Sequence, residues 1–260
     1  MKYALSIEYE GSKYNGFQSQ PNKNTIQDNL EKALSTIANE KISVICAGRT
    51  DAKVHARLQV CHFETEVIRT DYSWLMGSNK LLPKDIRIME VKQVSDDFHA
   101  RFSATARDYK YVIYNDKILP TSLNQKVYHC YDDLNVINLA KASEFFIGEH
   151  DFSSLRDSQC QSASPIRIIK DIIVMKKEKF IIVHIKGTAF LHHMIRNLMG
   201  VLIEVGTGKQ NVDWAFDVLK AKDRKQASKT LAATGLYFYE VTYDDYNPIC
   251  NWHFLDIFDL

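Results

Sequence analysis

Long apolar runs are missing from this chain. No stretch of about 18 consecutive apolar residues occurs among its 260 residues, so we expect no transmembrane helix. The N-terminal segment, MKYALSIEYE, carries Glu8 and Glu10 and lacks the apolar core of a signal peptide. These two absences lead us to expect a cytoplasmic protein that has no membrane partner.

Glycine is also scarce, with only 10 residues in the whole chain. The sequence contains no glycine-rich phosphate loop, no GxSxG and no HExxH. A GxGxG loop of the kind found in many methyltransferases is absent as well. We therefore expect no nucleotide cofactor, and a methyltransferase of that class is excluded.

Cysteines are few, and their number is odd. The five are Cys46, Cys61, Cys130, Cys160 and Cys250, and no two of them stand at CxxC spacing. This argues against both a disulfide framework and a zinc site, and we expect no bound metal. Most of the cysteines are expected to be small buried apolar side chains.

Positive charge is missing from the C-terminal end, since residues 240–260 contain five Asp or Glu and no Lys or Arg. Basic residues gather elsewhere: residues 156–193 hold seven against three acids, and residues 217–229 hold five against two. Such segregation fits a local basic face for a polyanion. Solvated surface charges explain it more simply, because the net charge is only +1.

Strand and helix patterns are mixed along the chain. Alternating apolar residues predict strands over 3–9, 42–46, 54–63, 86–94, 105–115, 166–176, 180–186 and 236–243. Helical spacing predicts helices from Thr25 to about 37 and over 72–82, 134–147, 189–205 and 212–221. Because hairpins outnumber βαβ units, we expect an α+β fold with a largely antiparallel sheet. A boundary near residue 105 would give two α+β halves, 1–105 and 106–260.

The first chemical motif is CAGRTDAKVHA, at residues 46–56, which forms a loop between two expected strands. Gly48 allows a tight turn, while Arg49 and Thr50 supply a cation and a hydroxyl beside Asp51. A carboxylate near an arginine keeps a low pKa and stays ionised, as a nucleophile or a base must. A turn stabilised by an ordinary ion pair is the alternative.

A second motif, RFSATARDYKYVIYN at residues 101–115, alternates Arg and Tyr along an expected strand. Arginines such as Arg101 and Arg107 bind phosphates, and rings such as Tyr109 stack on exposed bases. A half-buried strand with core tyrosines is the alternative, and composition alone favours it.

The third motif, AFLHHMIRNLMGVLIEVG at residues 189–206, reads as one apolar helix. His192, His193 and Arg196 lie near its N-terminal end, which is favourable for anions, and a buried arginine there needs a partner. Adjacent residues on a helix diverge by about 100°, which argues against a metal site at the two histidines. The expected buried stripe is Met194, Leu198, Val201 and Val205.

Six segments together resemble the TruA-type tRNA pseudouridine synthases over nearly the whole chain. In the order of that family they are YEGSKYNGFQSQ (9–20), CAGRTDAKVHA (46–56), DDFHARFSATARDYKYVIYN (96–115), GEHDFSSLRDSQCQS (148–162), FLHHMIRNLMGVLIEVG (190–206) and ATGLYFYEVTY (233–243). The resemblance implies the pseudouridine synthase fold, in which two α+β halves flank a central active-site cleft. It also implies a homodimer that acts on uridine at positions 38–40 of the tRNA anticodon arm.

The resemblance also assigns roles to residues. Asp51 matches the catalytic aspartate, Tyr109 the tyrosine that packs on the target base, and Arg196 the arginine that pairs with the catalytic carboxylate. The further RNA contacts expected are Arg49, Lys53, Arg101 and Arg107. The isomerisation donates no group and oxidises nothing, so it needs no cofactor. Attack of Asp51 on the sugar, attack on the uracil and removal of a C2′ proton are all open.

Two places depart from the pattern of that family. ATGLYF lacks the Ala-Pro often found before Gly-Leu, and Lys53 stands where the family usually has glycine. If position 53 requires a positive φ, lysine strains the loop. If the backbone is ordinary, lysine adds a cation that reaches a phosphate of the RNA. The second explanation is the favoured expectation.

Two non-enzymatic functions compete with this assignment. A tRNA chaperone that has kept the fold would have no need for Asp51, Tyr109 and Arg196 together. A structural factor of an RNA granule or of the ribosome would carry a stronger positive charge than +1.

Overall fold

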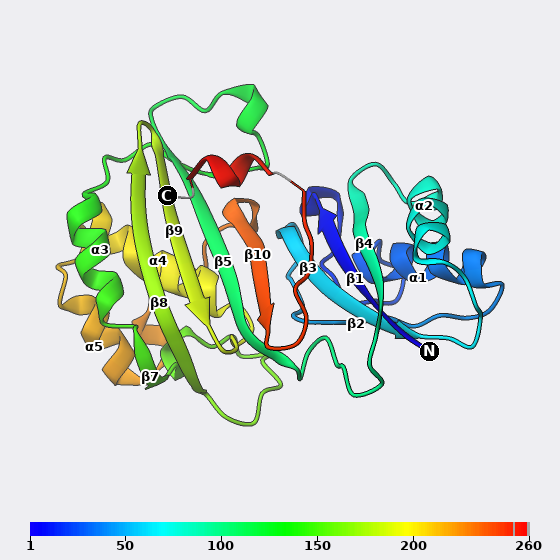
Figure 1. The fold of residues 1–260 in the computed structure, drawn as a ribbon. Coiled ribbons are helices and arrows are strands. Elements are labelled where there is room, and N and C mark those ends of the chain that lie inside the picture. Colours follow the sequence, from blue (N-terminus) through cyan, green and yellow to red (C-terminus); the bar gives the residue numbers. More distant parts are fainter. Residues whose placement is uncertain (252, 259–260) are drawn as a thin grey trace. The chain divides into compact units, whose positions relative to one another are not determined.

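The computed structural model describes residues 1–251 and 253–258 and divides them into two compact units (Figure 1). Unit 1 contains residues 1–107 and the described residues from Tyr237 onward, and unit 2 contains residues 108–236. The chain therefore leaves unit 1 near the expected boundary at residue 105. Its last strand differs from the expected halves, because that strand belongs to unit 1.

Unit 1 is built on a sheet with the strand order β4-β1-β3-β10. Strand β1 (Lys2–Tyr9) runs antiparallel to β3 (His55–Glu64) and to β4 (Ile86–Val94). Strand β2 (Ile45–Cys46) pairs antiparallel with β3, so only two residues of the expected strand 42–46 are extended in the sheet. Strand β10 (Leu236–Tyr243) pairs in parallel with β3, Tyr237 lying opposite His55, which explains why it belongs to this unit.

Two helices complete unit 1. Helix α1 (Ile26–Ala38) begins as its sequence predicts, because the Thr25 side chain accepts a hydrogen bond from the Asp28 N–H at 3.2 Å. Helix α2 (Asp71–Leu81) packs on α1 and on β4. Its Trp74 is fully buried, with its ring centroid 5.1 Å from that of Phe63.

Unit 2 has the strand order β5-β9-β8-β7. Strand β5 (Ala104–Asn115) begins in unit 1 and continues into unit 2, where β6 (Tyr128–Cys130) pairs with it in parallel. Strands β8 (Ile166–Lys177) and β9 (Phe180–Gly187) form the expected hairpin, and β7 (Gly148–Asp151) adds to β8. The sequence did not predict the short strands β6 and β7.

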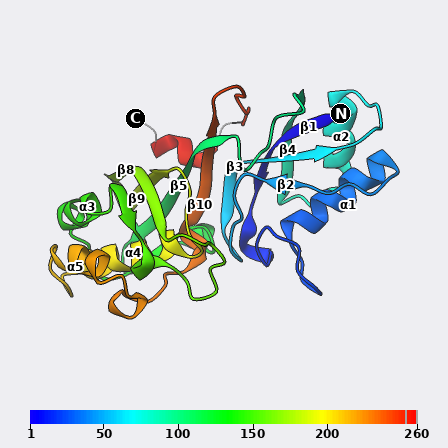
Figure 2. The same ribbon diagram turned by 90° about the horizontal axis from the view of Figure 1, so that it is seen from below.

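Three helices pack together in unit 2: α3 (Val136–Glu144), α4 (Met194–Gly206) and α5 (Trp214–Ala221). Helix α4 lies across one face of β8 and β9, as Figure 2 shows from a second direction. The expected stripe of α4 is correct, since the four side chains are at most 1% exposed: Met194, Leu198, Val201 and Val205.

The α+β fold class with a largely antiparallel sheet is confirmed, but two expected helices were wrong at their ends. Helix α4 begins at Met194 and not at 189, because His193 has φ +59°, a left-handed conformation through which a helix does not continue. Helix α3 ends at Glu144 and not at 147, because Gly148 is already paired with Ile169 in the sheet. None of the described helices has the length and apolarity needed to cross a membrane.

Candidate active site

The Asp51 loop, residues 47–54, lies between β2 and β3 in unit 1 and is held by backbone hydrogen bonds. At its start, Ala47 N donates to Val60 O at 2.8 Å on β3. In its middle, Phe17 N donates to Thr50 O at 3.0 Å. These two contacts hold the backbone before Asp51, and after it Lys53 N donates to Tyr14 O at 3.2 Å, so the loop is hydrogen-bonded on both sides of Asp51.

Gly16 permits the closest of these contacts. Its φ is +89°, and a Cβ added there would lie 2.7 Å from Thr50 O and 3.1 Å from the Asp51 carbonyl carbon. Only a residue without a side chain allows the segment before α1 to approach the Asp51 loop this closely.

Buried polar side chains also support the loop. The Tyr9 and Thr50 hydroxyls lie 2.8 Å apart, and both residues are buried. Gln59, which is fully buried, donates from Nε2 to Gly48 O at 2.6 Å. Neither Tyr9 nor Gln59 was predicted from sequence, because alternation along a strand shows that a side chain is buried but not which carbonyl it meets.

His55 is a further residue that the sequence did not predict, although it lies within the motif. Its Nδ1 accepts a hydrogen bond from Gly11 N at 3.1 Å, and its ring stacks on Tyr237 at a centroid distance of 4.7 Å. The imidazole is 2% exposed. It therefore joins the end of the Asp51 loop to β10 within unit 1.

The backbone at Lys53 corrects the favoured expectation. Lys53 has φ +68°, so it occupies the left-handed region and its backbone is not ordinary. Its N–H donates to Tyr14 O at 3.2 Å, and its side chain is exposed. Its contact with RNA stays a prediction.

The other three expected RNA contacts in unit 1 differ in exposure. Arg49 and Arg101 are exposed. Arg107 is buried, and its guanidinium donates to Ala47 O at 3.1 Å, to Ala104 O at 3.1 Å and to Arg101 O. Burial and these three acceptors argue against a phosphate contact for Arg107 and make it a support for the Asp51 loop.

In unit 2, Tyr109 lies on β5 and is 8% exposed. Its ring meets Phe190 edge to face, with centroids 5.2 Å apart and planes at 81°. An aromatic pair of this kind holds the tyrosine ring in one orientation.

Arg196 lies in the first turn of α4 and is partly buried. Its Nε donates to Leu231 O at 2.8 Å, while its own carbonyl accepts from Leu231 N at 3.2 Å. The Nε bond orients the guanidinium plane, because Nε and the two Nη groups are coplanar, and the backbone bond fixes the segment that carries the acceptor.

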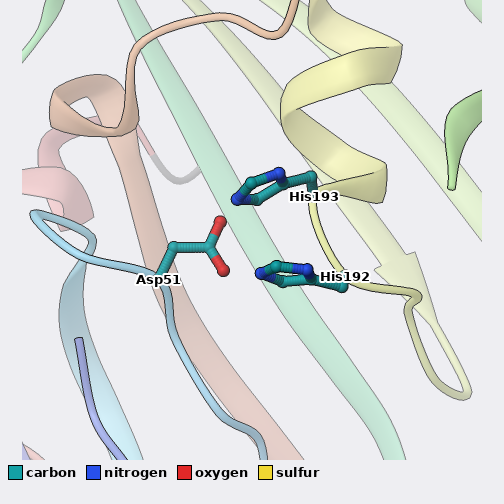
Figure 3. A group of neighbouring side chains, drawn as sticks. All are labelled: Asp51, His192 and His193. Atoms are coloured by element: carbon teal, nitrogen blue, oxygen red, sulfur yellow. The ribbon is translucent and has the colours of Figure 1, made fainter. Parts of the chain in front are cut away.

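Two histidines precede α4, and their arrangement corrects the expectation that they diverge. Figure 3 shows the imidazoles of His192 and His193 face to face; their centroids lie 4.0 Å apart with planes at 28°. They stack because both residues lie ahead of the helix and His193 has a positive φ. Figure 3 also shows the Asp51 carboxylate, which extends from the Asp51 loop of unit 1.

Asp157, another residue that the sequence did not predict, faces both rings from within unit 2. Its carboxylate lies 2.8 Å from His193 Nδ1 and 3.6 Å from His192 Nδ1. Burial acts to raise the pKa of Asp157, but the Gln159 N–H and His193 outweigh it and lower the pKa below its usual range. An ionised carboxylate thus directs the Nδ1 atoms of two stacked imidazoles.

Comparison with known proteins adds the family. A family model described as tRNA pseudouridine synthase matches residues 5–103 and 142–244. The tRNA pseudouridine synthase A of Shewanella denitrificans is 49% identical over 94% of both chains. That of Yersinia pseudotuberculosis is 50% identical over 95% of this chain and 93% of its own.

A protein of the same name from Escherichia coli K12 is 50% identical over 94% of this chain and 90% of its own. A solved structure of an H/ACA RNP bound to substrate RNA aligns at 11% identity with a TM-score of 0.32, too low to add to the assignment. Identity near one half over 94–95% of the chain, together with the family match over most of the sequence, shows that this chain belongs to the tRNA pseudouridine synthase family.

Proposed function

We propose that this enzyme isomerises uridine to pseudouridine at positions 38–40 of the tRNA anticodon arm, with Asp51 as the catalytic carboxylate. The observation that carries this proposal is the Asp51 loop, whose backbone is hydrogen-bonded on both sides of Asp51 and whose carbonyls accept hydrogen bonds from Gln59 and Arg107. The relatives named tRNA pseudouridine synthase A, which match over 93–94% of their own lengths, support the substrate class.

The proposed reaction balances without a second substrate. The C1′–N1 glycosidic bond of uridine breaks, the uracil turns, and a new bond joins C1′ to C5. The proton leaves C5 and N1 gains one, so the formula of the nucleoside does not change. A carboxylate, a positioned base and a proton acceptor suffice, and the reaction calls for no cofactor or metal.

Three side chains have proposed roles in this reaction. Asp51 acts on the sugar or on the base, and Tyr109, held by Phe190, packs on the uracil. Arg196 pairs with the catalytic carboxylate and keeps it ionised in a dry site. The support for Arg196 is its Nε–H bond to Leu231 O at 2.8 Å, which orients the guanidinium in advance.

The remaining proposals concern RNA and assembly. The exposed Arg49, Lys53 and Arg101 of unit 1 are proposed to meet phosphates near the target uridine. The protein is proposed to act as a homodimer that binds the anticodon stem-loop. Its cytoplasmic location, expected from the sequence, stays a prediction.

Tritium release from tRNA labelled at uracil C5 tests the proposal. We expect wild type to release tritium at positions 38–40, and Asp51→Asn to fold, bind tRNA and release none. Turnover of Asp51→Asn above a thousandth of wild type would overturn the role of Asp51. Asp71→Asn, which changes an exposed acid of α2 in the same unit, is the matched control and should keep full turnover.

Tests on the wild-type protein separate the enzyme from its alternative. Binding of tRNA without any tritium release would indicate a tRNA chaperone. Release at uridines outside positions 38–40 would keep the enzyme and overturn the proposed target.

A further inference from the structure

Phe102 in unit 1 is one of the most exposed large apolar side chains among the described residues, at 74%. It lies in the connection between β4 and β5, which begins after Val94 and ends at Ala104. A benzyl group displayed to water loses the burial free energy that a core position would give it. The exposure of this ring suggests that a binding partner covers it.

The ring of Phe102 has two neighbours that suit it to nucleic acid. The His99 imidazole lies 4.3 Å from it, centroid to centroid, with planes at 31°. The Arg101 guanidinium carbon lies 5.4 Å from its centroid. An aromatic pair beside a cation is the combination that binds a base by stacking and its phosphate by charge.

The backbone beneath Phe102 is held by its own loop. His99 Nδ1 accepts hydrogen bonds from Arg101 N and Phe102 N, both at 3.2 Å. Ser103 closes the turn, because its N–H donates to His99 O at 2.9 Å and its hydroxyl accepts from His99 N at 3.0 Å. The Phe102 ring is therefore presented from a closed turn.

Buried side chains from other elements hold the same turn. His62 on β3 accepts from Ala100 N at 3.1 Å, and the Tyr243 hydroxyl on β10 donates to Ala100 O at 2.7 Å. Arg107 on β5 donates to Arg101 O in the same turn. Three strands therefore contribute side chains that hold the turn from which Phe102 projects.

Arg107 also sets the place of this turn relative to the Asp51 loop. The same guanidinium donates to Arg101 O in the turn and to Ala47 O at 3.1 Å at the start of the Asp51 loop. Both segments lie in unit 1, so the exposed ring has a fixed position with respect to the residues around Asp51.

His99 contributes to this surface as a neutral ring. Burial, together with the charges of Lys2 and Arg101, lowers the pKa of His99 below its usual range. Near neutral pH its imidazole therefore adds aromatic surface, and Arg101 supplies the positive charge.

We propose that Phe102, backed by His99 and Arg101, is a stacking platform for an unpaired base of the tRNA substrate other than the target uridine. The proposal rests on the proposed function for the identity of the RNA. The platform holds the strand beside the Asp51 loop through its base, while Arg101 meets the phosphate. An apolar protein partner would leave the guanidinium unpaired, whereas a nucleotide satisfies both groups.

Equilibrium binding of unmodified tRNA to two Phe102 variants, one Arg101 variant and a control tests the platform. Phe102→Leu keeps apolar volume and loses the ring, and we expect affinity to fall on the order of tenfold. The slope of affinity against salt should not change, because no phosphate contact is lost. Phe102→Trp should restore affinity, and its added fluorescence should be quenched when tRNA binds.

Two further variants separate the contribution of the Arg101 charge to tRNA binding from the effect of removing any exposed ring. Arg101→Met should weaken binding and also reduce the salt slope by about one phosphate contact. Tyr72→Leu replaces another exposed ring of unit 1, 70% exposed on α2, and should bind tRNA as wild type does. An uninterrupted RNA duplex, which has no unpaired base, should bind Phe102→Leu and wild type equally.

Three results would overturn the platform. The first is that Phe102→Leu binds tRNA as tightly as wild type does. The second is that Phe102→Leu loses as much affinity for the duplex as for tRNA. The third is that Phe102→Leu changes the oligomeric state, which would assign Phe102 to a contact between two copies. Thermal unfolding of each variant distinguishes a folding defect from lost stacking. Failure of the proposed function is a separate result, the absence of tritium release by wild type.

Discussion

Lys53 carries a backbone conformation that its side chain disfavours. With φ +68° it lies in the left-handed region, where a residue with a Cβ costs about 1 kcal/mol or slightly more relative to glycine. The hydrogen bond from its N–H to Tyr14 O, at 3.2 Å, shows that the loop keeps this shape despite the cost. A long side chain is retained two residues after Asp51 at the expense of stability.

Lys53→Gly should therefore raise the free energy of unfolding by about 1 kcal/mol, a melting-temperature gain of roughly 2–4 °C. Lys53→Met, which keeps the Cβ and loses the charge, should have the same melting temperature as wild type. Calorimetry of both variants measures the backbone effect. If Lys53→Gly melts no higher than Lys53→Met, strain at this position is refuted.

The same pair of variants tests the cation. Lower tRNA affinity and a smaller salt slope for Lys53→Met than for wild type would show a phosphate contact. Equal affinity and equal salt slope for wild type and Lys53→Met would rule out the electrostatic role. The strain at Lys53 would then have no gain in RNA binding to offset it.

His62 should make the stability of the protein depend on pH. Burial, and then the neighbouring charges of His99 and Lys2, lower the pKa of His62 to about 4. In the unfolded chain a histidine titrates near its ordinary value of about 6.5, so the unfolded state binds the proton more readily. The contribution is fully present above about pH 6.5 and is lost as pH falls from there toward 4.

Between pH 7 and pH 5 this linkage should remove at most about 2 kcal/mol of unfolding free energy. Urea unfolding of wild type and of His62→Gln at both pH values measures it. The variant should be less stable than wild type at pH 7, because Ala100 N loses its acceptor. Its free energy of unfolding should nevertheless fall less than that of wild type between pH 7 and pH 5. An equal loss in both proteins would remove His62 as the cause.

At the scale of elements, helix α4 illustrates a site built by backbone contact. A Cβ added at Gly200 would lie 2.4 Å from Lys229 O and 2.4 Å from the Ser228 hydroxyl. The segment that passes there continues to Leu231, whose carbonyl binds Arg196 Nε at 2.8 Å. A close approach at Gly200 therefore sets the position of the acceptor that orients Arg196.

Gly200→Ala should consequently destabilise the protein by about 1–3 kcal/mol, although the same change in an open helix stabilises by about 1 kcal/mol. Turnover should also fall, because Leu231 moves. Gly77→Ala in α2 is the matched control: its Cβ would meet only side-chain atoms of Ile37, the nearest being the terminal Cδ1 at 2.8 Å, and no backbone atom. Equal unfolding free energies for the two variants in urea would contradict the role given to Gly200.

Elements whose pattern is local were predictable from the sequence. The alternation of Leu236–Tyr243 gave β10 with its observed ends, and the capping signal at Thr25 gave the start of α1. Helix α4 was extended too far at its N-terminus because apolar residues predominate from 189 to 205, and hydrophobicity alone does not reveal a left-handed residue such as His193. The two-residue strand β2 shows a similar limit, since pairing with β3 decides its length.

The candidate site was predictable where a motif was contiguous. Asp51 and its loop come from one segment, so sequence placed them directly. The supports from distant segments were not predictable: Gln59 on Gly48 O, Asp157 on His193 and Arg107 on Ala47 O depend on tertiary packing. Arg107 shows this limit most clearly. A cation in a tyrosine-rich strand suggested an RNA contact, although its guanidinium donates to backbone carbonyls within unit 1.

For the whole molecule, the basic residues counted along the chain exceed those available to RNA. Arg156 donates to Cys160 O and Ser162 O at 2.7 and 2.6 Å, so its guanidinium serves its own loop. Arg224 likewise bonds Ser228 O and Asn197 Oδ1, at 2.8 and 3.0 Å. Four exposed lysines remain on the surface of that second basic segment: Lys220, Lys222, Lys225 and Lys229.

With a net charge of +1 and part of its basic residues used internally, one 30.0 kDa chain has little positive surface for a folded tRNA. We therefore predict that two chains bind one substrate together, and that the protein sediments as a dimer at assay concentrations. Affinity should fall on the order of a thousandfold as salt rises from about 50 to about 200 mM, as for six or more phosphate contacts. Lys225→Gln should lower the salt slope by about one contact, whereas Lys84→Gln in the exposed connection before β4 serves as the comparison on unit 1. An active monomer in sedimentation, with turnover equal to that of the assembled protein, would refute the requirement for a dimer.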